Sequence, residues 1–172
     1  MTRAGHLVAR FAGSLRPRPL TASDLEFVRD TLSPAELGVW EHLGPADRVE
    51  SVATARAARA ALGADAEPRW LAAALLHDVG KTETRLGPFG RSTATVIAAV
   101  RGHRRVRGWD NAVGRYVNHD DLGEERLAAA GARPEAVIWA RTHHRPDLWP
   151  GTGIPLEVCA LLAEADGEPG RE

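Results

Sequence analysis

The feature that most constrains the fold of this chain is residues 71–81, LAAALLHDVGK, where a run of apolar side chains ends in His77 and Asp78. The run is apolar on nearly every side, which predicts a helix buried at the centre of a bundle. An unpaired carboxylate in such a place costs on the order of several kcal/mol, so a compensating partner is expected. A divalent metal ion is one such partner, because it binds an imidazole nitrogen and a carboxylate oxygen together.

The residues that follow fit the same interpretation. We expect Gly80 to let the chain turn sharply, and Lys81 to direct its ammonium group toward an anion at the metal. The alternative is a helix C-terminus at which the dipole favours His77 while Asp78 lies exposed to water. The buried, apolar context favours the metal site.

The rest of the chain predicts a series of short helices. Apolar residues recur at helical spacing, and glycine or proline marks each junction. Ser23 with Asp24, Ser33 with Glu36, and Asp47 are candidate N-terminal caps. Helices are predicted over residues 25–32, from 34 onward, and over 47–62, 70–79, 93–100, 112–118, 122–130, 134–143 and 155–166. No segment alternates as a strand would, so the predicted fold class is all-α, a single-domain helical bundle.

Composition and charge exclude several classes of function. The formal net charge is −1, so no overall field favours binding to nucleic acid or to a membrane. The single cysteine, Cys159, cannot form an internal disulfide. No apolar run approaches the roughly 20 residues of a membrane span, and the first residues lack the apolar run of a signal peptide. We therefore expect a cytoplasmic protein.

The segment LAAALLHDVGK resembles the HD-domain superfamily, whose mark is a buried apolar helix that ends in His-Asp-x-Gly-Lys. The resemblance extends over residues 47–166, about two-thirds of the chain. It implies an all-helical domain that binds one or two divalent metal ions and hydrolyses phosphate esters, commonly of nucleotides. Residues 46–168 would form this HD-type metal-binding domain, and residues 1–45 an N-terminal helical extension or cap.

The resemblance also implies a set of metal ligands. Matched by position, these are His77, Asp78, His119, one or both of His143 and His144, and the late Asp166. The family's first ligand, an early histidine, is replaced by Glu50 in ADRVESVATA. Glu50 either supplies a carboxylate to an oxygen-preferring ion, which is the interpretation we favour, or is a polar helix residue at a degenerate site.

Other residues are candidates for the chemistry. Asp78 would bridge two metal ions, and Lys81 and Arg141 would neutralise charge that develops on a phosphoryl group. Asp120 or its neighbour Asp121 would orient the attacking water, or would cap the helix that follows. The basic residues between 101 and 107 are expected to form a solvated loop.

The predicted function is metal-dependent hydrolysis of a phosphate ester or anhydride, with a nucleotide or related small molecule as substrate. The expected cofactor is one or two divalent ions of Mn, Fe, Mg or Co, and a homodimer is compatible with the sequence. Two alternatives stay open: an HD-type di-iron oxygenase, and a degenerate HD domain that binds metal or nucleotide without turnover.

Overall fold

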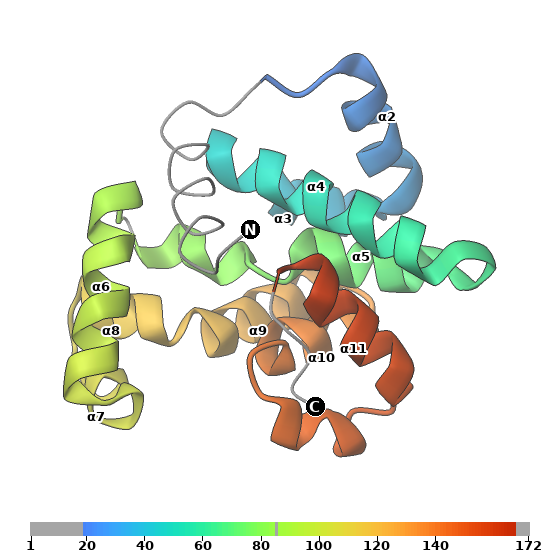
Figure 1. Cartoon of the computed structure of the whole chain (residues 1–172). Coiled ribbons are helices and arrows are strands. Elements are labelled where there is room, and N and C mark those ends of the chain that lie inside the picture. The colour runs from blue at the N-terminus through green and yellow to red at the C-terminus, as the bar shows by residue number, and fades with distance from the viewer. Residues whose placement is uncertain (1–18, 85, 168–172) are drawn as a thin grey trace, which may run out of the picture.

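The computed structural model describes residues 19–84 and 86–167, which form helices and turns without a β-strand. The first half comprises α2 (Ala22–Thr31), α3 (Pro34–Trp40), α4 (Pro45–Leu62), η1 (Gly63–Asp65), α5 (Pro68–Leu76), η2 (Val79–Thr84) and α6 (Pro88–Arg101). The second comprises α7 (His103–Arg107), α8 (Ala112–Val117), α9 (His119–Ala130), α10 (Pro134–Thr142), η3 (Pro146–Gly151) and α11 (Leu156–Ala165). This is the all-α, single-domain bundle that the sequence predicts (Figure 1).

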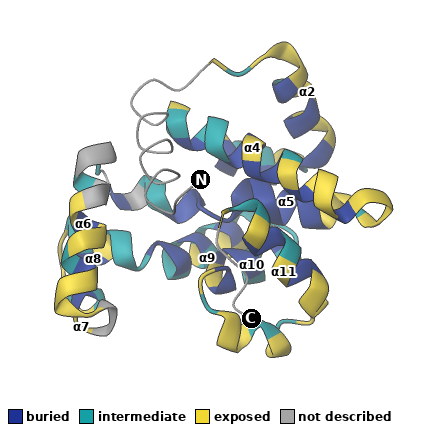
Figure 2. Ribbon diagram, in the orientation of Figure 1, coloured by how far each residue is buried: buried dark blue, intermediate teal, exposed yellow. Residues whose placement is uncertain are grey.

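Helix α5 is the centre of the bundle. Every side chain from Trp70 to Leu76 is buried, so the helix is dark along this whole stretch in Figure 2. It packs against α4 and α10, and it also contacts α2, α3 and α11. The predicted buried helix is thus confirmed, because an all-apolar surface can only be covered by neighbours on every side.

The two N-terminal helices share this core. Phe27 and Val28 of α2 and Trp40 of α3 belong to the same cluster of buried side chains as α5. The predicted extension therefore packs as part of the bundle over its described residues, while residues 1–18 lie outside them. Ser33 and Glu36 form the expected capping box of α3.

Two of the predicted caps are corrected. Helix α2 is capped by Thr21 rather than by Ser23, with Asp24 completing the capping box. The N-cap of α4 is Gly44, and Asp47 lies in the first turn of that helix.

A buried ion pair joins α3 to the start of α10. Glu36 is fully buried and accepts hydrogen bonds from the backbone of Ser33 at 2.8 Å and of Arg133 at 3.0 Å. The guanidinium of Arg133 donates a further bond to this carboxylate at 2.9 Å. The negative charge of Glu36 is therefore well compensated.

Helices α6, α7 and α8 form an arm on one side of the bundle (Figure 1). Helix α7 covers part of the basic stretch that was expected to be a loop. Helix α8 packs against η2, directly after the central helix, and leads into α9. The arm thereby delivers His119 to the end of α5. None of the described helices is both long enough and apolar enough to cross a membrane.

Candidate metal centre

The centre lies where α5 ends. The helix stops at Leu76, with His77 as its C-cap, rather than near residue 79 as predicted. The chain then continues through η2. His77 is 1% and Asp78 8% exposed, so the pair is buried as expected from its apolar context.

The chain turns between α5 and η2, where Gly80 lies, and the missing side chain of Gly80 also allows close packing. The φ angle of Gly80 is not positive. A Cβ atom at this position would lie 1.8 Å from the carbonyl oxygen of His119 and 2.7 Å from the backbone nitrogen of Gly123. The missing side chain lets η2 lie directly on α9, which brings His119 to Asp78.

Three histidines are oriented in the same way. Each lies at or just beyond the C-terminus of a helix, and its Nδ1 atom faces the carbonyl oxygen three residues earlier. The pairs are His77 with Ala74 at 2.9 Å, His119 with Tyr116 at 2.8 Å and His143 with Ala140 at 2.9 Å. Because a carbonyl only accepts, Nδ1 carries a proton and Nε2 is the atom that each ring presents to the centre.

The three Nε2 atoms gather around the carboxylate of Asp78. Oδ1 of Asp78 lies 3.4 Å from Nε2 of His119 and 3.8 Å from Nε2 of His143. Oδ2 lies 3.3 Å from Nε2 of His77, and Oδ1 of Asp166 lies 3.3 Å from that same nitrogen. Asp78 therefore has two sides. Its Oδ1 atom faces His119 and His143, which we call the histidine-rich side, and its Oδ2 atom faces His77, which also approaches Asp166.

The residues fit a cation. Among the described residues, four buried atoms here have no hydrogen-bond partner: Nε2 of His77, His119 and His143, and Oδ1 of Asp78. Buried polar atoms are normally satisfied, so a cluster of four such atoms needs a partner. Helices α5, α10 and α11 have His77, His143 and Asp166 as their C-caps, so the negative ends of these helices lie at the group and favour positive charge there. The group can therefore hold a metal ion.

A set of four potential ligands gathers on the histidine-rich side. One ligand atom from each of Asp78, His119, His143 and His144 lies within 4.8 Å of the others. The sequence left open which residue of the His143–His144 pair faces the centre, and both contribute an atom. His144 is exposed whereas the other three are buried, so the centre reaches solvent at His144.

The other oxygen of Asp78 is engaged by a lysine. Oδ2 forms a hydrogen-bonded ion pair with the ammonium of Lys81. Glu50, half-buried on α4, acts electrostatically on this ammonium. Glu50 is not one of the four residues whose ligand atoms gather on the histidine-rich side. The charge of Glu50 thus acts on Lys81, and Glu50 does not belong to that group of ligand atoms.

Burial and charge set the protonation of these groups. Burial alone would raise the pKa of Asp78, but Lys81 and His77 lower it well below its usual range. Burial would lower the pKa of His77, yet the carboxylates of Asp78 and Asp166 raise it well above that of free imidazole. Burial lowers the pKa of His143 well below its usual value, and the neighbouring histidines add to the effect. His143 is therefore neutral at physiological pH, as a metal ligand must be.

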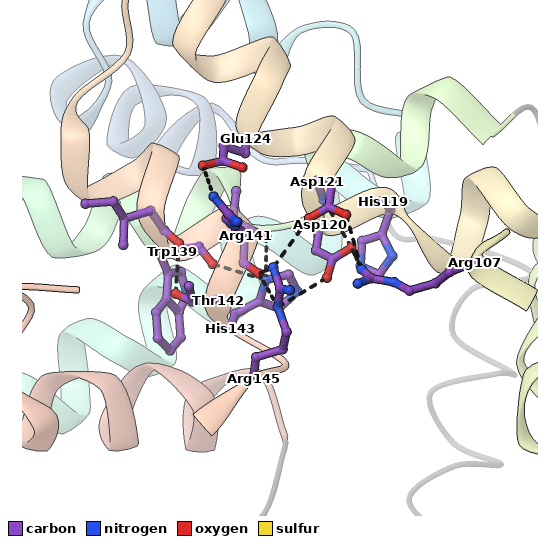
Figure 3. A network of polar contacts seen from close by, with 12 residues as sticks. Arg107, His119, Asp120, Asp121, Glu124, Trp139, Arg141, Thr142, His143 and Arg145 are labelled. Atoms are coloured by element: carbon purple, nitrogen blue, oxygen red, sulfur yellow. Dashed lines mark hydrogen bonds and ion pairs between the residues drawn. The ribbon is translucent and has the colours of Figure 1, made fainter. Parts of the chain in front are cut away.

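A layer of ion pairs lies beside the histidines (Figure 3). Asp120 is buried directly after His119 and forms an ion pair with Arg107, and its Oδ2 atom lies 3.8 Å from Nε of Arg145. A guanidinium nitrogen of Arg145 also lies 3.4 Å from Oδ1 of Asp121. The carboxylate that we expected to orient a water is thus bound to two arginines, which tie α7, α9 and the end of α10 together.

Arg141 lies apart from the histidines. Its guanidinium is half exposed and donates a hydrogen bond to Glu124 at 3.0 Å. Residues two apart on a helix point to different sides, so Arg141 and His143 cannot both face the centre. Arg145, rather than Arg141, is the arginine of this segment that reaches the ion pairs beside the centre.

Two residues near the centre were not predicted from the sequence. Arg107 was grouped with a basic loop, and only its pairing with Asp120 shows its place. Tyr116 stacks on His119, with ring centroids 5.8 Å apart. The usable signal for Tyr116 was its spacing of three residues from His119, which places it about one helical turn before that histidine.

Comparison of the chain with models of known protein families, with curated proteins and with solved structures finds no match. What the protein does must therefore be inferred from the geometry of the centre and from the motif.

Proposed function

We propose that the protein is a metal-dependent phosphohydrolase of the HD-domain type, which acts on a phosphate ester or anhydride of a small molecule such as a nucleotide. The observation that supports this most is the set of four unpartnered buried atoms around Asp78. They belong to the residues that the HD-type motif predicts, and Asp166 approaches His77 at 3.3 Å as the family order implies. Buried polar atoms without partners are costly, so a cluster of this composition favours a bound cation.

In this proposal the residues of the centre have different roles. A bound dication would supply a water of lowered pKa and would polarise the phosphoryl group. The Nδ1 bonds of His77, His119 and His143 to backbone carbonyls hold the rings with Nε2 facing inward. The exposed edge at His144 is the side from which a substrate can approach.

Arg145 is the candidate for binding the phosphate. It directly follows His144, and its contact with Asp121 at 3.4 Å is made to a carboxylate that is 44% exposed. A phosphate dianion can replace such an exposed partner, and a guanidinium binds two phosphate oxygens at once. Lys81 keeps a positive charge next to Asp78. Asp120 acts through Arg107 and Arg145 as a positioning residue.

The test combines metal analysis with a substrate panel. Wild-type protein, purified without added metal, is assayed for bound metal and for phosphate release from nucleotides, sugar phosphates and pyrophosphate with Mn²⁺, Mg²⁺ or Co²⁺. We expect phosphate release by the wild type and none by Asp78→Asn. Asp110→Asn, which changes a fully exposed carboxylate, is the matched control and should retain activity.

Other outcomes contradict the proposal. Bound iron with substrate-dependent oxygen uptake and no phosphate release would indicate the oxygenase. Metal binding without either activity on the panel would indicate a degenerate domain. No metal uptake at all would exclude the centre itself.

A further inference from the structure

We propose that one face of the arm docks on an anionic lipid surface. This arm face consists of Val96, Ile97, Val100, Arg101 and Trp109, which line one groove on the arm. Its apolar side chains enter the lipid, and its arginine binds the anionic headgroups. The inference lies outside the metal centre, and it does not depend on the reaction proposed above.

Exposed apolar side chains gather on α6. Of the four strongly exposed large apolar side chains that the structure describes, two are Val96, at 61%, and Val100, at 76%. They lie four residues apart on the helix, so they share one face. Ala94 and Ala98, on another face of the same helix, are fully buried. The outward side of α6 thus carries aliphatic groups where a surface helix ordinarily carries polar ones.

An apolar groove lies beside the two valines. Its volume is about 260 Å³, and Trp109 lines it together with the α6 side chains. Trp109 is half-buried, and its indole N–H donates no hydrogen bond to another described residue. Tryptophan is enriched at the depth of lipid headgroups, where its ring meets hydrocarbon and its N–H meets polar groups. The groove therefore has the composition expected at the boundary between hydrocarbon and headgroups.

Basic residues are concentrated in the same part of the chain. Residues 86–109 contain five arginines and no Asp or Glu, whereas the other residues include 17 Lys and Arg against 23 Asp and Glu. The net charge of −1 is thus the sum of a positive segment and a negative remainder. Arg107 is bound to Asp120, but Arg101 and Arg105 are exposed and form no ion pair with another described residue. Such a segment is attracted to an anionic membrane.

Two other occupants fit the arm face less well. A second copy of the chain would bring an equally positive segment against the first, and like charges repel. A nucleic acid would satisfy the arginines, but it binds through phosphate contacts and base stacking and would leave Val96 and Val100 without an apolar partner. A lipid surface matches the aliphatic, indole and guanidinium groups together.

The test is cosedimentation of the full chain with lipid vesicles. Vesicles of phosphatidylglycerol and phosphatidylcholine in equal parts should bind the wild type, and vesicles of phosphatidylcholine alone should not. High salt should weaken the binding, because it screens the charges. The double variant Val96→Ser, Val100→Ser should bind at least about tenfold more weakly, since less apolar area is buried. Leu156→Ser, which changes a 55% exposed side chain on α11, is the matched control and should bind as the wild type does.

Charge variants test the electrostatic part. Arg101→Gln should weaken binding by about fivefold, the contribution typical of one basic side chain at an anionic surface. Arg29→Gln, an exposed change on α2, is its control and should have no effect. Asp110→Asn should strengthen binding, because it removes an exposed carboxylate directly after Trp109.

Several results would overturn the inference. These are the absence of binding to anionic vesicles, equal binding to neutral ones, and unchanged binding by the folded valine variant. Tighter binding to a DNA duplex than to anionic vesicles, or a dimer that the valine changes dissociate, would assign the arm face to another partner. If the valine variant does not fold by circular dichroism, vesicles of brominated lipid decide. They should quench a larger fraction of the fluorescence of the wild type than of Trp109→Phe, and equal quenching refutes the docking.

Discussion

Gly80 and His119 are in backbone contact: a methyl group on Gly80 would overlap the carbonyl oxygen of His119, at 1.8 Å. This contact joins the turn after the central helix to the first residue of α9. Since His119 also approaches Asp78 at 3.4 Å, the same contact helps to position one residue of the candidate metal centre. Gly80 therefore affects both the packing of η2 on α9 and the geometry of the candidate metal centre.

Gly80→Ala should consequently lower both the stability of the fold and the affinity for metal ions. The backbone atoms around this site cannot move aside as a flexible side chain could, so we expect a loss of about 3 kcal/mol in the free energy of unfolding. Metal affinity should fall as well, because His119 moves away from Asp78. Urea unfolding and calorimetric metal titration measure the two effects. Gly38→Ala is the matched control, since no atom lies within 4 Å of its new methyl group and alanine favours the helix. A Gly80→Ala protein as stable as the wild type would contradict the close contact.

Asp120→Asn should weaken metal binding without unfolding the protein. The carboxylate of Asp120 holds Arg107 and Arg145, which flank the helix ends that carry His119 and His144. Loss of a positioning partner of this kind typically costs about 10- to 100-fold in metal affinity. Competition of each variant with a fluorescent chelator measures the change. Asp110→Asn, on the exposed surface, should bind as the wild type does. Equal affinity in both variants would limit Asp120 to a structural role.

Glu36→Gln should change how stability depends on pH. Burial opposes the ionisation of Glu36, but hydrogen bonds from Arg133 and Ser33 and the charge of Arg133 outweigh it and lower the pKa of this carboxyl. A pKa that is lower in the folded state than in the unfolded state stabilises the fold above the unfolded value and ceases to do so as pH falls through the folded value. We expect Glu36→Gln to cost about 2 kcal/mol at pH 7. That difference should shrink below about pH 4.3, the ordinary pKa of a glutamate.

The measurement is urea unfolding of wild type and variant from pH 7 to pH 3. Glu41→Gln, an exposed change at the end of α3, should follow the wild type at every pH. A difference between Glu36→Gln and wild type that stays constant across this range would mean that the Glu36 carboxylate does not titrate with folding.

Metal ions should stabilise the fold through Asp78. A ligand that binds only the native state at 100 times its dissociation constant adds about 2.7 kcal/mol to the free energy of unfolding. The wild type should therefore melt at a higher temperature with Mn²⁺ or Co²⁺ than with a chelator. Asp78→Asn should melt at the same temperature under both conditions. A shift of equal size in both proteins would show that the ions bind elsewhere.

Much of the fold follows from local signals in the sequence. The capping box of Ser33 and Glu36 and the apolar surface of α5 each specify an element without help from the rest of the chain. The predicted end of α5, at residue 79, lies too far along the chain. The spacing of apolar residues cannot show that the helix ends where the His77 side chain bonds to its backbone. At this point the backbone carbonyl of Ala74 accepts a hydrogen bond from the ring of His77, and not from the backbone of a further helical turn.

The centre was harder to predict because it depends on helical phase and on contacts distant in sequence. Arg141 and Arg145 both flank the two histidines in the sequence, yet only Arg145, which lies beyond the end of α10, reaches Asp120, whereas Arg141 pairs with Glu124. The role of Gly80 could not be derived either, since its neighbour His119 comes from a remote part of the chain. The same holds for the ion pair of Arg107 with Asp120.

The histidines that end or follow α5, α8 and α10 give the length of each of these helices a specific meaning. Each ring is aimed by a carbonyl of the helical turn that precedes it, so the direction of its free nitrogen is fixed by where that helix terminates. Inserting or deleting one residue upstream would rotate the ring by about 100° around the helix axis, away from its companions. The lengths of these three helices together determine whether the three Nε2 atoms face one another. Insertions should therefore be tolerated in the connecting turns far better than inside these helices.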